Sequence, residues 1–328
     1  MTDFQNIPFH KIVKLGQSTL LHKDLFTVSW IIDRFCNYNC TYCWPYARSN
    51  TTAFLDFSVY ENAILRIKDQ ARKNGFQKFH FSFSGGEPTA YLHLLKLIDV
   101  YAKDNIDYQS IHMTTNLSPS LKWWNKWVKK VSKLSRKSIT ASYHDEFADE
   151  DEFIKKCVFL QEHDIFITIN QVMVPSRFDL LYERCVRFKN AGINVTLKPQ
   201  SDPTAKFIVN DYTDDQIKIL KTGFPQEWKG VELLQVELYD NNNNVYYLDQ
   251  AERMNAFKFN KFKGWNCNAG FQSIIIREDE IKRSYSCADD PIGKIYEDFN
   301  IFTAVRKCVT DSCVSSADSK IPKEYIIK

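Results

Sequence analysis

The sequence predicts an α/β protein built around a parallel sheet, and three observations support this fold class. Strand-like and helix-like segments alternate from residue 26 to residue 200. Each strand pattern is followed by a helical one, which supplies the crossover that parallel strands need. The 328 residues, 44% of them hydrophobic and 25% charged, are enough for a large buried core. These patterns alone allow either a doubly wound sheet or a partial barrel.

The predicted elements follow the period of the apolar residues. The strand-like segments before residue 201 cover 26–32, 78–84, 110–116, 138–142, 165–174 and 195–200. The helical patterns between them cover 58–74 and about 91–103, 119–131, 150–163 and 177–191. Beyond residue 210, a short helix at about 213–222 leads to a predicted hairpin at 236–249 with an Asn-rich turn.

We divide the chain into four segments on these patterns. They are an N-terminal extension (1–24), the α/β domain (25–210), a helix and β-hairpin linker (211–263), and a cysteine-bearing tail (264–328). The tail is too small for a rich apolar core, so a bound metal would stabilise it.

Composition excludes several classes of protein. The net charge of +3 gives no indication of nucleic-acid or membrane-surface binding. No apolar run is long enough to span a membrane, and the first residues lack the apolar stretch of a signal peptide. Nine cysteines without an export signal argue for metal binding in a reducing compartment rather than for disulfides. We therefore expect a cytoplasmic protein with no membrane partner.

The first cysteine cluster follows the first predicted strand. Cys36, Cys40 and Cys43 share one short loop at the carboxyl end of the sheet, where α/β folds place their active sites. Thiolates bind zinc or iron–sulfur clusters, and three of them on a 4Fe–4S cluster leave one iron free for a small molecule. A zinc site completed by a distant histidine, or a purely structural loop, are the alternatives.

A glycine-rich turn ends the second predicted strand at Gly85, Gly86, Glu87 and Pro88. Glycines there would let the backbone approach a ligand closely. Read alone, the turn could simply be a tight exit from a strand. The same turn is a much more specific signal of a ligand site when it follows a C-x3-C-x2-C loop by one βα unit.

With these two motifs, the sequence resembles the radical S-adenosylmethionine (SAM) superfamily over about residues 25–200. The resemblance implies a partial (β/α)6 TIM-type barrel and a 4Fe–4S cluster whose unique iron binds the amino and carboxylate groups of SAM. It implies reductive cleavage of SAM to methionine and a 5′-deoxyadenosyl radical that abstracts hydrogen from the substrate. A reducing partner such as flavodoxin or ferredoxin would supply the electron.

The resemblance also implies roles for individual residues. Tyr42 would lie near the adenine, and the backbone of Gly85–Pro88 would meet the methionine amino group. Asn116 and Ser142 end the third and fourth strands and would contact the SAM carboxylate or ribose, unless they are polar strand ends bonded within their own loops. His144 is a candidate acid or base, with a structural role as the alternative.

The tail carries a second cluster, formed by Cys267, Cys287, Cys308 and Cys313. Four thiolates can close a zinc site or fully ligate a 4Fe–4S cluster. The tail resembles the twitch or SPASM-type extension of radical SAM enzymes, a small α+β domain with an auxiliary 4Fe–4S cluster. The final pair departs from that family in its C-x4-C spacing, and Ser315 stands where another cysteine would be expected.

The sequence therefore predicts a radical SAM oxidoreductase or isomerase that acts on an unactivated C–H position. The auxiliary cluster would assist oxidation or rearrangement. The substrate is open among a peptide, an amino sugar and a nucleotide. One alternative is an isomerase that modifies a nucleobase, motivated by the Lys- and Trp-rich segment 122–137. Another is a non-catalytic iron–sulfur redox protein, which would leave the glycine-rich turn without a purpose.

Overall fold

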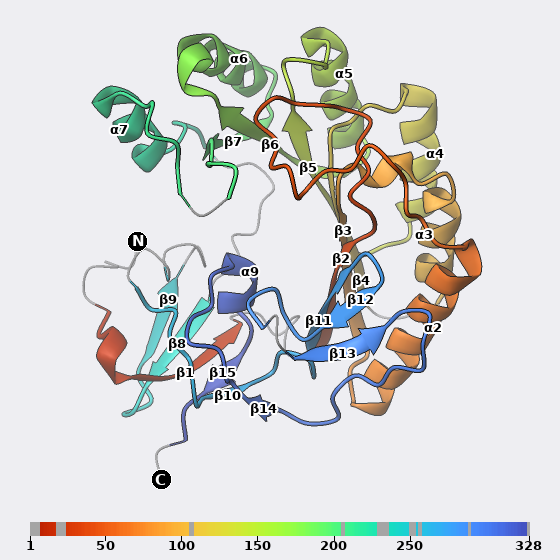
Figure 1. Cartoon of the computed structure of the whole chain (residues 1–328), viewed down its shortest axis with the longest axis vertical. Helices are drawn as coiled ribbons and strands as arrows, with labels where there is room; N and C mark the ends of the chain where they lie inside the picture. The colour runs from red at the N-terminus through yellow and green to blue at the C-terminus, as the bar shows by residue number, and fades with distance from the viewer. Residues whose placement is uncertain are drawn as a thin grey trace.

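The computed structural model describes residues 7–17, 24–104, 108–204, 207–227, 236–248, 254, 258–287 and 290–326. The strands form two sheets, one of nine strands and one of six (Figure 1). The larger sheet has the order β13-β12-β11-β2-β3-β4-β5-β6-β7, and the smaller one the order β14-β10-β15-β1-β8-β9.

Six parallel strands in sequence order make up most of the larger sheet. They are β2 (Leu25–Ile31), β3 (Lys78–Ser84), β4 (Gln109–Thr115), β5 (Arg136–Tyr143), β6 (Phe166–Met173) and β7 (Asn194–Pro199). Each overlaps a predicted strand, so the prediction of an α/β fold with a parallel sheet is confirmed.

Helices lie in an arc along one side of this sheet (Figure 1). They are α2 (Phe57–Lys73), α3 (Leu94–Ala102), α4 (Leu121–Val131), α5 (Glu150–Gln161), α6 (Phe178–Asn190) and α7 (Asp214–Thr222). Strand side chains alternate between the two faces of the sheet. In β3, Phe79, Phe81 and Phe83 are fully buried in one core with the helices. The residues between them are polar and face the opposite, concave side of the sheet.

Part of the C-terminal tail extends the same sheet. β11 (Ser273–Arg277) pairs in parallel with β2, and β12 (Glu280–Lys282) and β13 (Pro291–Lys294) continue it in antiparallel fashion. Ile274, Ile275 and Ile276 are all buried, as expected for a strand that is covered on both faces. The described sheet order is therefore open, with β13 and β7 at its two edges.

The six-stranded sheet collects strands from three distant parts of the chain. Its members are β14 (Arg306–Lys307), β10 (Asn266–Cys267), β15 (Lys323–Glu324), β1 (Ile12–Gln17), β8 (Val236–Asp240) and β9 (Val245–Leu248). β8 and β9 form the predicted hairpin as far as residue 248, and residue 249 lies outside the described residues. The sheets thus cross the boundaries expected at residues 24, 210 and 263.

Short helices complete the fold. They are η2 (Phe9–Lys11), η3 (Pro88–Ala90), η4 (Pro175–Arg177) and α9 (Ser316–Ser319).

The long helices pack against the core. On α4, Trp124 and Trp127 are fully buried, so this helix packs an apolar face into the core. Cys157 and Cys185 are likewise fully buried, as predicted for core thiols. None of the helices within the described ranges has the length and apolar character of a membrane span.

Candidate cofactor-binding site

The first three cysteines lie in the loop between β2 and α2, where β2 ends. Cys40 is buried, Cys36 is partly buried and Cys43 is exposed, and none of them forms a disulfide. Burial, together with Glu146, Cys36 and Cys43 nearby, raises the pKa of the Cys40 thiol to about 12. The three thiols are thus close enough to affect one another. Binding of metal would have to displace their protons.

Asp33 fixes both ends of this cysteine loop (residues 33–53). Its carboxylate is 5% exposed and accepts hydrogen bonds from the backbone N–H of Phe35 at 2.6 Å and of Ala53 at 2.7 Å. Those two residues are 18 positions apart in sequence, so one buried side chain closes the loop. Sequence reasoning missed Asp33, although an aspartate directly after a strand is a common loop-starting signal.

The glycine-rich turn forms the seat of the cysteine loop. Gly86 N donates to the carbonyl of Asp33 at 2.9 Å, and Glu87 N donates to that of Phe35 at 2.7 Å. A Cβ added to Gly85 would lie 2.3 Å from the Asp33 carbonyl oxygen, and one added to Gly86 would lie 2.2 Å from that of Phe35. The close approach made possible by these glycines is therefore to the cysteine loop itself. The predicted approach to a ligand stays a prediction.

Glu87 joins the turn to the end of β4. Its buried carboxylate accepts hydrogen bonds from Thr89 N at 2.9 Å, Thr89 Oγ1 at 2.6 Å, Thr115 Oγ1 at 2.7 Å and Asn116 N at 2.6 Å. Burial raises the pKa of Glu87, and these hydrogen bonds partly offset that effect. The side chain is thus occupied in holding the turn, which leaves the backbone of residues 85–88 as the part that could meet a ligand.

The structure brings Asn116 to the cysteine loop. Its Nδ2 donates to Asn37 Oδ1 at 2.9 Å and lies 4.0 Å from Cys36 Sγ. Thr115 is opposite Ala141 in the sheet register, so Ser142 comes to the same edge one strand away. Their predicted contacts with SAM remain predictions.

Tyr42 and His144 form a pair across the mouth of the sheet. The Tyr42 hydroxyl is 2.8 Å from His144 Nδ1, and the ring centroids are 5.9 Å apart. Burial lowers the pKa of His144 to about 4, against a smaller opposite effect of Glu146. His144 is therefore neutral at pH 7, and its Nδ1 shares a hydrogen bond with the Tyr42 hydroxyl. This arrangement positions Tyr42, while a role of His144 as acid or base stays a prediction.

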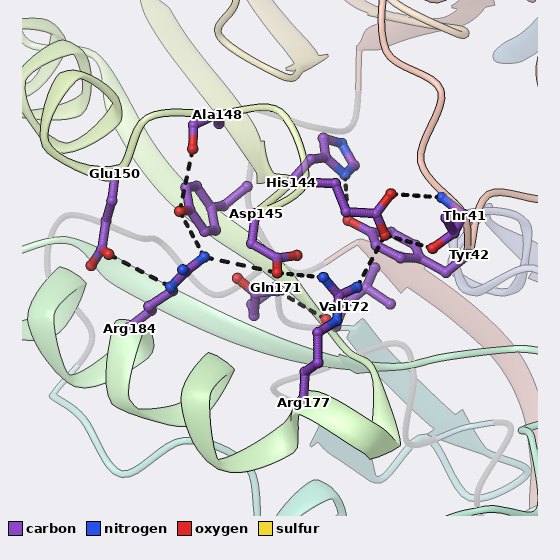
Figure 2. Close-up of polar contacts among 12 residues, drawn as sticks. Thr41, Tyr42, His144, Asp145, Ala148, Glu150, Gln171, Val172, Arg177 and Arg184 are labelled. Atoms are coloured by element: carbon purple, nitrogen blue, oxygen red, sulfur yellow. Dashed lines mark hydrogen bonds and ion pairs between the residues drawn. The ribbon is translucent and has the colours of Figure 1, made fainter.

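Beside this pair, Glu146 ties the cysteine loop to the loop after β5. Its carboxylate accepts hydrogen bonds from Thr41 N at 2.9 Å and Thr41 Oγ1 at 2.5 Å. Arg177, at the end of η4, binds Glu146 at 3.0 Å and Asp145 at 2.6 Å. Figure 2 shows Thr41 and Tyr42 facing His144 and Asp145, with Arg177 extending toward them. Sequence reasoning missed this anchor, for which the acidic pair after a strand was the available signal.

Replacing Glu146 with glutamine is expected to weaken the fold by about 1–3 kcal/mol at pH 7, because hydrogen bonds to a charged, largely buried group are lost. Burial alone would raise the pKa of Glu146, but hydrogen bonds from Thr41 and Arg177 lower it below 4.5. The stabilisation is therefore full above pH 4.5 and is lost as the pH falls through the lowered pKa.

Urea unfolding of both proteins across this pH range measures the effect. The matched control is Glu152→Gln, which removes an exposed partner of Lys155 and should cost less than about 1 kcal/mol. Equal losses in the two variants would contradict the anchoring role of Glu146.

The four cysteines of the tail come close to one another, and three of them, Cys267, Cys308 and Cys313, lie in the core beside the six-stranded sheet. Cys267, Cys287, Cys308 and Cys313 are each at most 5% exposed, although they come from separate strands and loops. Burial raises the pKa of Cys308, and Cys267 and Cys287 raise it further. Burial also raises the pKa of Cys313 to about 12, while the nearby Lys323 opposes this shift. Ser315, which stands where a further cysteine would be expected, lines a cavity next to the nine-stranded sheet.

The two sets of cysteines have the donor atoms that iron–sulfur clusters need. Within the described ranges, no three His, Cys, Asp or Glu side chains are grouped closely enough for one metal ion. A 4Fe–4S cluster needs more widely spaced thiolates, because each one binds a different iron. The first loop offers three thiols and the tail offers four.

Comparison with known proteins shows a similarity over the first part of the chain. Residues 30–142 match the model of the Radical SAM superfamily. A solved structure described as a tagged form of "anSMEcpe with bound AdoMet" is similar over 84% of this chain and 79% of that chain, with a TM-score of 0.52. At 15% sequence identity, this likeness shows a shared fold alone. No curated protein sequence matches the chain.

Proposed function

We propose, from the radical SAM domain at residues 30–142, that this protein is a radical SAM enzyme. The cluster would be held by Cys36, Cys40 and Cys43. The observation that carries the proposal is the seating of the cysteine loop on the glycine-rich turn, through Gly86 N to Asp33 O and Glu87 N to Phe35 O. When bound, the 4Fe–4S cluster and SAM would together supply a 5′-deoxyadenosyl radical that abstracts hydrogen from an unactivated C–H bond.

The residues of this chain would position SAM. The backbone of residues 85–88 would meet the amino group of SAM through carbonyl oxygens, because Gly86 N and Glu87 N are bonded to the cysteine loop and the Glu87 side chain is bonded to Thr89, Thr115 and Asn116. The hydrogen bond between Tyr42 and His144 would hold the tyrosine ring next to the adenine of SAM. Asn116 and Ser142 would contact the carboxylate or ribose from the same edge of the sheet.

The test is cleavage of SAM by reduced, anaerobically reconstituted protein. We expect slow formation of 5′-deoxyadenosine even without substrate. A reductant such as flavodoxin or ferredoxin would have access to the site, because Cys43 is exposed. Protein that holds iron in the first site but forms no 5′-deoxyadenosine would contradict the proposal.

We further propose that Cys267, Cys287, Cys308 and Cys313 hold an auxiliary 4Fe–4S cluster, in a region that resembles a twitch domain. Four buried thiols at one place, with Lys323 nearby, support it. The auxiliary cluster would assist net oxidation or rearrangement, which makes the protein an oxidoreductase or an isomerase.

The variant Cys313→Ala is expected to lose iron from the tail and still form 5′-deoxyadenosine. The parallel strands and their helices share a separate core, which includes Phe81 and Ile139, so the barrel should remain folded. Iron content and the electron paramagnetic resonance spectrum of the reduced protein measure this effect. Cys185→Ser, which changes a thiol in the other core, serves as control. Full iron and an unchanged spectrum in Cys313→Ala would show that Cys313 is not a ligand.

The alternative of a nucleobase-modifying isomerase rests on the Lys- and Trp-rich segment 122–137. On α4, Trp124 and Trp127 are fully buried and offer no surface on which bases could stack, whereas Trp123 is only partly buried.

A further inference from the structure

A cavity of about 500 Å³ lies between the concave face of the nine-stranded sheet and the C-terminal residues. This is the size of a small-molecule site. Strands β2 to β5 and β11 form one wall, and residues 283–285 and 315–322 contribute the other. At its upper end the cavity reaches Ile31 and Ser84, next to the glycine-rich turn.

The sheet register arranges the wall in level rows. The lower row runs across five strands and consists of Ser273, Thr27, His80, Ser110 and Arg136. The next inward-facing row consists of Ile275, Ser29, Ser82, His112 and Ser138. The top row contains Ser84 beside Ile31. The wall therefore consists mainly of hydroxyl and imidazole groups.

Imidazoles and hydroxyls are bonded within these rows. His80 Nδ1 is 2.8 Å from Ser110 Oγ, and His112 Nδ1 is 2.9 Å from Ser138 Oγ. By contrast, the buried Ser273 Oγ has no hydrogen-bond partner in the part of the chain that the structure describes. It lies in the same row as Arg136, at the lower end of the cavity.

The charged groups that line the cavity are mainly cationic. They are Arg136, Arg283 and Lys320, against the single carboxylate of Asp318. That carboxylate is already bonded to Tyr285 N at 3.3 Å and to Ser286 N at 2.6 Å. Arg283 is 1% exposed and its Nη1 forms an ion pair with Asp290 at 3.0 Å, while its Nε and Nη2 have no hydrogen-bond partner among the described residues.

Two of these cations act on His112, in the second row. Burial, Lys320 and Arg136 together lower the pKa of His112 to about 4. His112 is therefore neutral at pH 7, and both of its ring nitrogens are bonded, Nδ1 to Ser138 Oγ at 2.9 Å and Nε2 to Thr140 Oγ1 at 3.2 Å.

We propose that this cavity binds a small, elongated polar substrate with one anionic group, a phosphate or a carboxylate. The anionic group lies at the lower end, between Arg136, Lys320 and the free hydroxyl of Ser273. The reacting carbon lies at the upper end, beside Ser84. Arg136 is level with His80, which is four residues before Ser84 on β3, so the two ends are about 13 Å apart. That the ligand is a substrate rests on the proposed function, whereas binding of the anion does not.

Calorimetric titration of the anaerobically reconstituted enzyme with inorganic phosphate tests the proposal, and sodium acetate is the carboxylate probe. At least one of these anions should bind to the parent protein, and bound SAM should not displace it. Arg136→Gln should weaken that binding about tenfold or more, because a charge-assisted hydrogen bond is lost. The matched control is Arg306→Gln on the exposed strand β14, which should bind like the parent.

Ser273→Ala keeps the test decisive if Arg136→Gln does not fold. The Ser273 hydroxyl has no described partner, so its removal leaves no group unsatisfied and the melting temperature should not change. The affinity of the Ser273→Ala variant for the anion should nevertheless fall severalfold. The proposal is overturned if neither anion binds, if SAM competes with the anion, or if both variants bind like the parent.

The same preparations are assayed for 5′-deoxyadenosine. SAM cleavage without anion binding would contradict this inference alone. Anion binding without SAM cleavage would contradict the proposed function alone.

Discussion

Replacing Cys36, Cys40 and Cys43 together with alanine will abolish SAM cleavage and remove about half of the iron from reconstituted protein. Two 4Fe–4S clusters correspond to about eight irons per chain, and the tail would keep about four of them. Losing the thiols should leave the fold intact, because Asp33 and Glu146 hold the loop through other atoms. Iron analysis and a 5′-deoxyadenosine assay measure the two effects.

The control for the triple variant is Cys157→Ser, which changes a fully buried thiol on α5. It should keep all of the iron and the parent rate of SAM cleavage. If the triple variant keeps all of its iron, the first cluster is not held by this loop. If zinc is found in the tail in place of iron, the auxiliary cluster is ruled out.

Gly86→Ala is expected to lose both the first cluster and SAM cleavage. The added Cβ would lie 2.2 Å from the carbonyl oxygen of Phe35 and 2.4 Å from that of Arg34. These are backbone atoms, so the cysteine loop itself must move, at a cost of about 1–3 kcal/mol or more. Iron content, SAM cleavage and the midpoint of urea unfolding should all fall together.

Gly16→Ala is the matched control, since its added Cβ meets only side-chain atoms at 3.7 Å or more. The variant also distinguishes two explanations of the glycine-rich turn. If the glycines serve only to let SAM approach, Gly86→Ala should keep its iron and lose SAM cleavage alone. Such a result would contradict the structural explanation, in which the glycines seat the cysteine loop.

The sequence by itself determined the local structure and which residues are candidates for the site. Alternating apolar residues and the helical periods predicted the six parallel strands and their helices, because these patterns depend on near neighbours in the chain. The three-cysteine loop and the glycine-rich turn indicated the radical SAM superfamily, because the donor atoms and their spacing are written in a short stretch.

Only the tertiary structure decided the contacts between distant segments. Glu146 lies 105 residues from Thr41, and no local pattern indicates that they meet. Strand pairing outside the six parallel strands depends on which strand edges remain free once those six have paired. This applies to the pairing of β11 with β2 and to the joining of β1, β8 and β15 in one sheet. The cationic end of the cavity arises in the same way, since the sheet register puts Ser273 in the same row as Arg136. Each contact needs two segments that are distant in sequence, and the pattern within one segment does not specify its partner. The packing of the whole chain determines which segments meet.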